Sequence, residues 1–257
     1  MSAEQPVLGK FVWHDLMTSD VDKAIAYYTE LFGWTIKDIP MGPTTYKMIH
    51  GGGQDQGGIA PLDPNQGAPS HWLCHATVAS ADAAAATAEQ LGGKVLVPPS
   101  DIPNIGRFSI LQGPLGAVIS AYTPNAWAGE GAEGPPAVGS FCWHELLALD
   151  PQVGGHFFST IFGWTITDVD MGPMGTYHLF KRDNGKDAGG MLKKPDGNPP
   201  SAWLPYVQVA DANATAERVR ELGGQVFVPP TDIPNVGRFA VTADPTGAVI
   251  AILGPSS

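Results

Sequence analysis

The residues with the clearest chemical potential form a tetrapeptide that occurs twice. Trp13-His14-Asp15-Leu16 returns 130 residues later as Trp143-His144-Glu145-Leu146. Each copy places an imidazole beside a carboxylate, and these are the groups that proteins use for proton transfer and for binding divalent metals. The flanking indole adds a flat apolar surface. The elements that carry these two copies therefore decide which groups meet a ligand.

The tetrapeptide belongs to a longer internal repeat. Residues 31–43 match residues 161–173, and residues 91–108 match residues 222–239 with 14 of 18 positions identical. Residues 123–140 contain four Gly and three Pro and show no periodicity, which is typical of a surface linker. We predict two modules, residues 1–122 and 139–257, joined by a linker over residues 123–138.

Each module contains the same elements. Residues 10–17 alternate as in a half-buried strand. Asp20 then stands at the N-cap position of a helix with apolar residues at helical spacing, and Gly33 stands where a helix ends. Three short strands follow, and the cycle repeats from residue 72. Helix and strands in this order indicate an α+β fold with two strand–helix–strand–strand–strand units per module.

Composition excludes several classes of function. The net charge is −11 with only 14 Lys and Arg, so no basic surface for nucleic acid or anionic lipid is expected. No apolar run reaches the roughly 18 residues of a membrane span. The N-terminus lacks a signal-peptide pattern, and two cysteines make no disulfide framework. We therefore expect a cytoplasmic protein.

Three landmarks of the chain resemble the vicinal oxygen chelate superfamily, the glyoxalase I, bleomycin-resistance and extradiol-dioxygenase group. They are the segments Asp20–Trp34 and Asp150–Trp164 and the turn Asp244-Pro245-Thr246-Gly247, which is reduced to Gly113-Pro114-Leu115-Gly116 in module one. The resemblance implies four βαβββ units in two tandem modules. Each module would be a curved mixed sheet that forms a cup, with its helices outside.

The resemblance also implies a divalent metal held by His or Gln, His and Glu. Counting from the landmarks, these positions fall in module one at Trp13, Leu73 and Ser120, and in module two at Trp143, Leu204 and Ala251. None of these side chains supplies an imidazole or a carboxylate. We therefore predict no metal and no other cofactor at these positions. A rearranged metal site that uses Asp15 or Glu145 with His75 remains open.

The histidines of the tetrapeptide lie one residue from the ligand position, and one residue in a strand means the opposite face. His14 and His144 should therefore face the helix with Leu16 and Leu146, as satisfied core residues. A register shifted by one residue would bring them into the cup instead.

On this register the cup is lined by aromatic side chains with one carboxylate per module, as small-molecule sites usually are. We predict Asp15 and Glu145 as catalytic acid–base groups. The alternative is that they are rim carboxylates paired with Arg107 or Arg238. The predicted substrate-binding residues are Trp13, Tyr46, His75, Ser120, Tyr122, Trp143, Tyr177 and Tyr206.

The repeated Pro-Pro-x-Asp-Ile-Pro-Asn-x-Gly-Arg-Phe segment forms a second candidate feature. Its prolines predict a rigid excursion outside the strands. It could be a lip over the cup, or a structural loop in which Asp101 and Asp232 cap local backbone groups.

Two functions follow. The chain could be an enzyme that acts on a small, partly aromatic molecule without the usual metal triad, in a lyase, isomerase or oxygenase type of reaction. Alternatively, it could be a non-catalytic binding or drug-sequestering protein. The expected partner is a small molecule, with no nucleic acid and no membrane, in a monomer or a homodimer.

Overall fold

A computed structural model of the chain describes residues 7–42, 44–63, 65, 67–127, 129, 134–172, 175–194 and 200–256. Residues 128 and 130–133 of the predicted linker lie outside this part. No helix in the described part is both long and apolar enough to cross a membrane.

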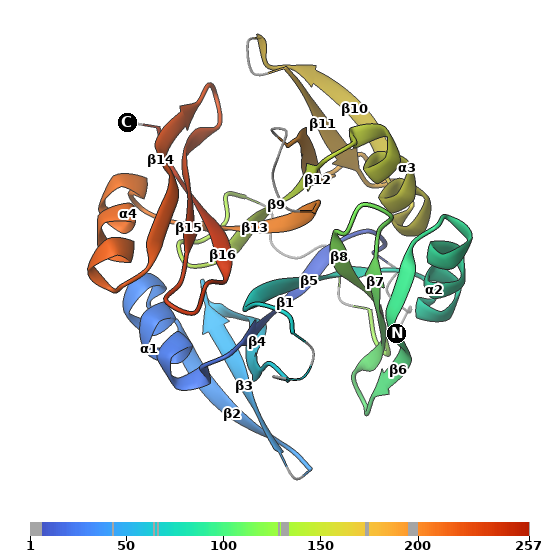
Figure 1. The fold of residues 1–257 in the computed structure, drawn as a ribbon, viewed down its shortest axis with the longest axis horizontal. Helices are drawn as coiled ribbons and strands as arrows, with labels where there is room; N and C mark the ends of the chain where they lie inside the picture. Colours follow the sequence, from blue (N-terminus) through green and yellow to red (C-terminus); the bar gives the residue numbers. More distant parts are fainter. Residues whose placement is uncertain are drawn as a thin grey trace. The chain divides into compact units, whose positions relative to one another are not determined.

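The repeat is visible in the order of elements (Figure 1). Among the described residues each module contains eight strands and two helices, and the helices follow the first and fifth strands, as predicted. The first module consists of β1 (Phe11–Thr18), α1 (Val21–Phe32), β2 (Thr35–Met41), β3 (Thr44–Gly51), β4 (Gln54–Pro61), β5 (His71–Thr77), α2 (Ala81–Gln90), β6 (Lys94–Ile102), β7 (Gly106–Gln112) and β8 (Val118–Pro124). The second consists of β9 (Phe141–Ala148), α3 (Pro151–Phe162), β10 (Thr165–Asp170), β11 (Thr176–Lys181), β12 (Asp187–Lys193), β13 (Ala202–Gln208), α4 (Ala212–Glu221), β14 (Gln225–Ile233), β15 (Gly237–Ala243) and β16 (Val249–Gly254).

The strands of each module form one eight-stranded mixed sheet. The order is β2-β3-β4-β1-β5-β8-β7-β6 in the first and β10-β11-β12-β9-β13-β16-β15-β14 in the second. β1 pairs with β4 and β5 pairs with β8 in parallel, whereas the hairpins are antiparallel. The predicted α+β architecture of two tandem modules is confirmed.

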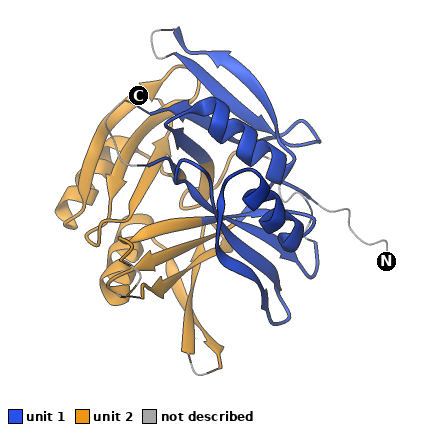
Figure 2. Cartoon of the chain, turned by 45° about the vertical axis from the view of Figure 1, so that its right-hand side comes forward, with its two compact units in different colours: residues 1–12, 74–133, 144–203 blue, residues 13–73, 134–143, 204–257 orange. Residues whose placement is uncertain are grey.

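The compact units of the chain combine halves of both repeats (Figure 2). Unit 1 comprises residues 1–12, 74–133 and 144–203, and unit 2 comprises residues 13–73, 134–143 and 204–257. Within unit 1, α2 packs beside α3, and within unit 2, α1 packs beside α4.

Local sequence explains the helices. Asp20 accepts a hydrogen bond from the Lys23 backbone N–H at the start of α1, and Gly33 ends the helix in the left-handed conformation with φ 68°. Asp150 caps α3 in the same way. Glycine is unfavourable inside a helix, but a Cβ at Gly155 would come within 2.9 Å of Ile166 Cδ1. At Gly155 the helix therefore lies close to side chains of its sheet.

Each unit has its own apolar core between helices and sheet. Large side chains dominate both, and each fully buried one contributes about 1.5–3 kcal/mol. The unit 1 core includes Leu146, Phe157, Phe158, Trp164 and Trp203. The unit 2 core includes Leu16, Tyr28, Trp34, Trp72 and Ile250.

The predicted excursion at the Pro-Pro-x-Asp-Ile segment is wrong. Pro98 and Pro99 belong to β6, and their counterparts belong to β14. The pairing register shifts between Val97 and Ser100, so the two prolines occupy a bulge. β6 is also an edge strand, where the missing proline N–H breaks no ladder bond.

Candidate functional site

Alternation along β1 separates two sets of side chains. His14, Leu16 and Thr18 are buried, while Trp13 and Asp15 are half-buried on the other side. Leu16 packs in the core with residues of α1. His14 therefore lies on the helix-packed face, and Trp13 and Asp15 lie on the opposite face, here called the open face. The spacing predicts this arrangement, and the burial pattern confirms it.

Both histidines are held by stacking. The His14 ring lies 3.6 Å from that of Phe141 at an interplanar angle of 14°, and its Nδ1 lies 3.0 Å from the Gln56 carbonyl oxygen. In unit 1 the His144 ring stacks on Phe11 at 3.8 Å and 6°. Each phenylalanine comes from the other repeat. Both imidazoles therefore lie in the buried layer of their own unit.

The open face of unit 2 carries a chain of three hydrogen-bonded side chains. The Trp13 indole Nε1–H donates to the Tyr46 hydroxyl oxygen at 2.7 Å. The Tyr46 hydroxyl in turn donates to Asp15 Oδ1 at 2.5 Å. The sequence predicts all three residues as site residues, and the structure brings them together.

Electrostatics assign the proton in this chain. Burial raises the pKa of the Tyr46 phenol well above its usual value, and the neighbouring Asp15 carboxylate raises it further. The phenol therefore stays protonated and acts as a hydrogen-bond donor. Asp15 is the proton acceptor of the three.

In unit 1, His75 and Ser120 are neighbours on parallel strands and are both buried. The Ser120 hydroxyl is fully buried and has no hydrogen-bond partner among the described residues. Tyr122 is half-buried, and its hydroxyl donates to the Ile105 carbonyl at 3.1 Å. These predicted binding residues therefore belong largely to the interior of unit 1.

Tyr206 of unit 2 is also buried, with 4% of its surface exposed. It pairs with Ala251 on the parallel strand β16, and its ring lies 6.4 Å from that of Phe239.

The first strand of module two differs from that of module one in one respect. Glu145 is buried together with His144 and Leu146, whereas Asp15 is half-buried.

The arginines proposed as partners for the site carboxylates bind other groups. Arg107 donates to both oxygens of Asp82, at 2.7 and 2.9 Å, and to Asp101 at 2.8 Å. Arg238 pairs with Asp232 at 2.8 Å in unit 2. Asp101 and Asp232 therefore anchor their hairpins through arginine.

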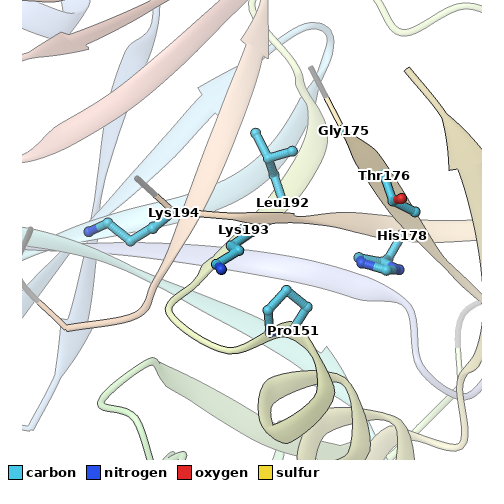
Figure 3. Close-up of a pocket in the computed structure, with 7 residues that line it drawn as sticks. All are labelled: Pro151, Gly175, Thr176, His178, Leu192, Lys193 and Lys194. Carbon is cyan, nitrogen blue, oxygen red and sulfur yellow. The ribbon is translucent and has the colours of Figure 1, made fainter. Parts of the chain in front are cut away.

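Two hollows in the described part of the chain are lined by residues other than the predicted site residues. The larger, in unit 1, has a volume of about 440 Å³ and lies beside the start of α3 (Figure 3). Its lining residues are Pro151, Gly175, Thr176, His178, Leu192, Lys193 and Lys194. His178 Nδ1 lies 2.6 Å from Asp168 Oδ1, so part of its polarity is satisfied within the chain. The smaller, in unit 2, measures about 240 Å³ and includes Leu31, Phe32 and Val138.

Comparison with known proteins places this chain in a family. Residues 10–120 and 147–252 match the family described as glyoxalase/bleomycin resistance protein/dioxygenase superfamily. The chain belongs to this superfamily. Both modules are included in the match, which agrees with the repeat.

Curated relatives cover nearly the whole chain. "Putative glyoxylase CFP32" of Mycobacterium bovis is 35% identical over 248 residues, which cover 95% of this chain and 94% of the relative. "Anthracycline biosynthesis protein DauV" of Streptomyces sp. (strain C5) is 29% identical over 260 residues, which cover 95% and 93%. The superfamily relatives thus have the same two-module length.

Solved structures of superfamily enzymes share the fold. A Mn(II)-bound glyoxalase from Novosphingobium aromaticivorans matches with a TM-score of 0.64 at 14% identity, over 97% of this chain and 83% of that one. The 2,3-dioxygenase LapB from Pseudomonas sp. KL28 matches with a TM-score of 0.62 at 11% identity, over 99% and 94%. At these identities the likeness shows the fold alone.

Sequence reasoning missed the glycines beside the candidate site. Gly58 is the strand partner of Asp15, and a Cβ there would overlap the Tyr46 hydroxyl. The signal was present, because Gly57-Gly58 in β4 recurs as Gly189-Gly190 in β12. A glycine pair inside a strand marks a close approach of another group.

Proposed function

We propose that this chain is an enzyme that binds a small aromatic molecule on the open face of unit 2 and uses Asp15 as its general base. The observation that carries this proposal is the hydrogen-bond chain from Trp13 through Tyr46 to Asp15. A half-buried carboxylate beside an indole and a phenol provides a proton acceptor next to flat apolar surface. Two of the curated relatives are named as anthracycline biosynthesis proteins, which supports a polycyclic aromatic ligand.

The hydrogen-bond chain orients Asp15 for this role. The phenol holds one carboxylate oxygen in place, and the indole fixes the phenol in turn. Because the Tyr46 pKa is raised, the phenol does not compete for the substrate proton at neutral pH. Asp15 can then take a proton from a hydroxyl, an ammonium or an activated carbon of the bound molecule.

We further propose that this chemistry does not use the metal centre usual in the superfamily. Superfamily relatives include a Mn(II)-bound glyoxalase, so the fold accommodates a divalent ion. In this chain the indole at position 13 donates its only N–H to Tyr46 and offers no lone pair. Leucine at position 73 and serine at position 120 replace the other ligands. This donor set does not fit Mn, Fe, Ni or Zn.

Binding without turnover is the second candidate. It is favoured by the saturated state of the Tyr46 hydroxyl, which donates to Asp15 and accepts from Trp13. A group fixed in this way suits recognition of a ligand as well as it suits catalysis. Recovery of the ligand chemically unchanged would distinguish binding from catalysis.

The proposal is tested by titrating the purified protein with doxorubicin, an anthracycline, and following its fluorescence. Asp15→Asn should weaken binding about tenfold or more, which corresponds to about 1.4 kcal/mol, and Tyr46→Phe should weaken it less. Asp38→Asn is the control, because Asp38 is an exposed carboxylate paired with Lys47. Unchanged affinity in Asp15→Asn would contradict the proposed site.

Metal content and turnover are measured on the same samples. Elemental analysis should find no stoichiometric Fe, Mn, Ni or Zn in the protein as isolated. A stoichiometric metal that disappears in Asp15→Asn would contradict the metal-free proposal. Mass spectrometry of the ligand after incubation then decides between catalysis and binding.

A further inference from the structure

The phenol of Tyr46 occupies space that only glycine leaves free. A Cβ built on Gly58 would overlap the Tyr46 hydroxyl oxygen and Cζ. Any side chain at position 58 would therefore move the phenol. Gly58 is the strand partner of Asp15 in the parallel β1–β4 pair. Neighbouring strands lie about 4.8 Å apart, so a phenol above Gly58 is within reach of the Asp15 carboxylate.

The adjacent glycine has a different explanation. A Cβ at Gly57 would overlap the backbone carbonyl oxygen of His14, so the close approach of two strands requires that glycine. At Gly58 the group in the way is a side chain, and it is the tyrosine of the site. Gly58 is therefore a positioning residue for the Tyr46–Asp15 hydrogen bond.

Unit 1 repeats this arrangement with different residues. A Cβ at Gly190 would overlap the hydroxyl oxygen and Cζ of Tyr177, the same two atoms as in Tyr46. Gly190 is the partner of Glu145 in the parallel β12–β9 pair. A carboxylate residue, a glycine and a tyrosine thus take equivalent places in both units.

We infer that unit 1 contains a second site of the same kind, in which Gly190 positions the Tyr177 hydroxyl to donate to the Glu145 carboxylate. Its chemistry rests on the function proposed for Asp15. The ligand belongs to the same class, a small aromatic molecule with a group that can give up a proton or donate a hydrogen bond.

The second site has less room than the first. Glu145 is only 9% exposed, whereas Asp15 is half-buried. The glutamate side chain is also longer than aspartate by one methylene, which is about 1.5 Å. Its carboxylate therefore projects further from the strand. The unit 1 site should take a smaller ring system than the unit 2 site.

The geometry is tested first without any ligand. Gly190→Ala should lower the thermal midpoint in the wild-type chain and have a much smaller effect in a Tyr177→Ala background, where no phenol is in the way. The pair Gly58→Ala and Tyr46→Ala serves as the reference, because the hydrogen bond is observed there. Equal effects of Gly190→Ala in both backgrounds would overturn the inference.

A second readout measures the hydrogen bond itself. Glu145→Gln and Tyr177→Phe should each lower the free energy of unfolding, and the double variant should lose less than the sum of the two single losses, because the hydrogen bond is lost only once. A merely structural role for Gly190 predicts no such coupling. Additive losses would overturn the inference even if Gly190→Ala does not fold.

Ligand binding separates this inference from the proposed function. With catechol, a single-ring probe, Glu145→Gln should lose one binding event per chain that Asp15→Asn retains. Loss in Asp15→Asn alone would leave the unit 2 function standing and overturn the second site. If neither probe binds, the proposed function fails, and the coupling between Glu145→Gln and Tyr177→Phe decides whether the Glu145–Tyr177 pair exists.

Discussion

Helices α1 and α3 are equivalent in the two repeats, yet the side chains beneath them differ between unit 2 and unit 1. In unit 2 the Tyr28 hydroxyl donates to Asp244 at 3.0 Å and accepts from Trp72 Nε1 at 3.1 Å. In unit 1 the same places hold Phe158 and Gly113, which pack directly against each other. Beneath α1 a hydrogen-bonded carboxylate is thus buried, whereas beneath α3 a glycine takes its place.

The missing tyrosine hydroxyl in unit 1 leaves one buried hydrogen-bond donor without an acceptor in the described part of the chain. Trp203 is the counterpart of Trp72, and its buried indole N–H has no hydrogen-bond partner among the described residues. Phenylalanine at position 158 cannot accept that hydrogen. An unpaired buried donor costs about 1–3 kcal/mol, so the apolar version of the core retains a penalty that the polar version avoids.

The turn that carries Asp244 shows what the carboxylate is for. Asp244 N–H donates to the Ala248 carbonyl in unit 2, and Gly113 N–H donates to the Ala117 carbonyl in unit 1. The turn therefore forms without the carboxylate. Asp244 adds contacts to the Thr246 and Ala248 backbone N–H groups and to the Tyr28 hydroxyl. Its role is to tie the turn to α1.

Among the substitutions that test this difference between the units, removal of the Asp244 carboxylate should lower the free energy of unfolding most. Asp244→Ala leaves the Tyr28 hydroxyl and two backbone N–H groups without their acceptor, and we expect a loss of about 3–4 kcal/mol in unfolding free energy. Urea unfolding measures the loss, and hydrogen exchange should locate it in unit 2. Gly113→Ala is the equivalent change in unit 1, where the added Cβ would lie 3.2 Å from Phe158 Cζ, and we expect a smaller loss of about 1 kcal/mol from this tight contact. Similar losses in the two variants would contradict the assigned difference.

Removal of the hydroxyl alone should make unit 2 resemble unit 1. Tyr28→Phe leaves the Trp72 N–H unpaired and takes one donor from Asp244, and we expect a loss of about 1.5–3 kcal/mol of unfolding free energy.

The reverse change, Phe158→Tyr with Gly113→Asp, rebuilds the network beneath α3. Its two substitutions should be more favourable together than the sum of the single changes, by about 1–2 kcal/mol. Additive single effects would show that the two cores are not interchangeable.

Local patterns predicted much of this molecule. The repeat, the helix caps and the face of β1 that carries Asp15 follow from short-range spacing and are confirmed. Contacts between residues far apart in sequence were not predictable. The Tyr46–Asp15 hydrogen bond requires the β1–β4 register, which places Gly58 opposite Asp15. The stacking of His14 on Phe141 requires the second repeat to supply a ring.

One error shows where local sequence was insufficient. Pro98 and Pro99 predicted a break, but an edge strand with a bulge accommodates them. The pairing within the sheet, rather than the local sequence, decided the outcome.

The smallest effect is expected at the surface, where equivalent arginines of the two units have different partners. Arg107 of unit 1 holds two carboxylates, Asp82 and Asp101. Its counterpart in unit 2, Arg238, holds one carboxylate and the Asn213 amide. Hydrogen bonds from Arg107 lower the pKa of Asp82 below its usual value.

The prediction for this exposed pair concerns the pKa of Asp82. In Arg107→Gln the Asp82 midpoint should rise toward the usual value of about 3.9, as measured by carboxyl NMR titration, whereas Arg238→Gln should leave it in place. Because the folded-state pKa is lowered, the pair stabilises the fold above the unfolded-state pKa, and the contribution is lost as the pH falls through the folded-state pKa. The variant and the wild type should therefore converge in stability in acid and differ at neutral pH. High salt should shrink that difference, since both partners are exposed. An Asp82 midpoint that does not move in Arg107→Gln would show that the hydrogen bonds from arginine do not set it.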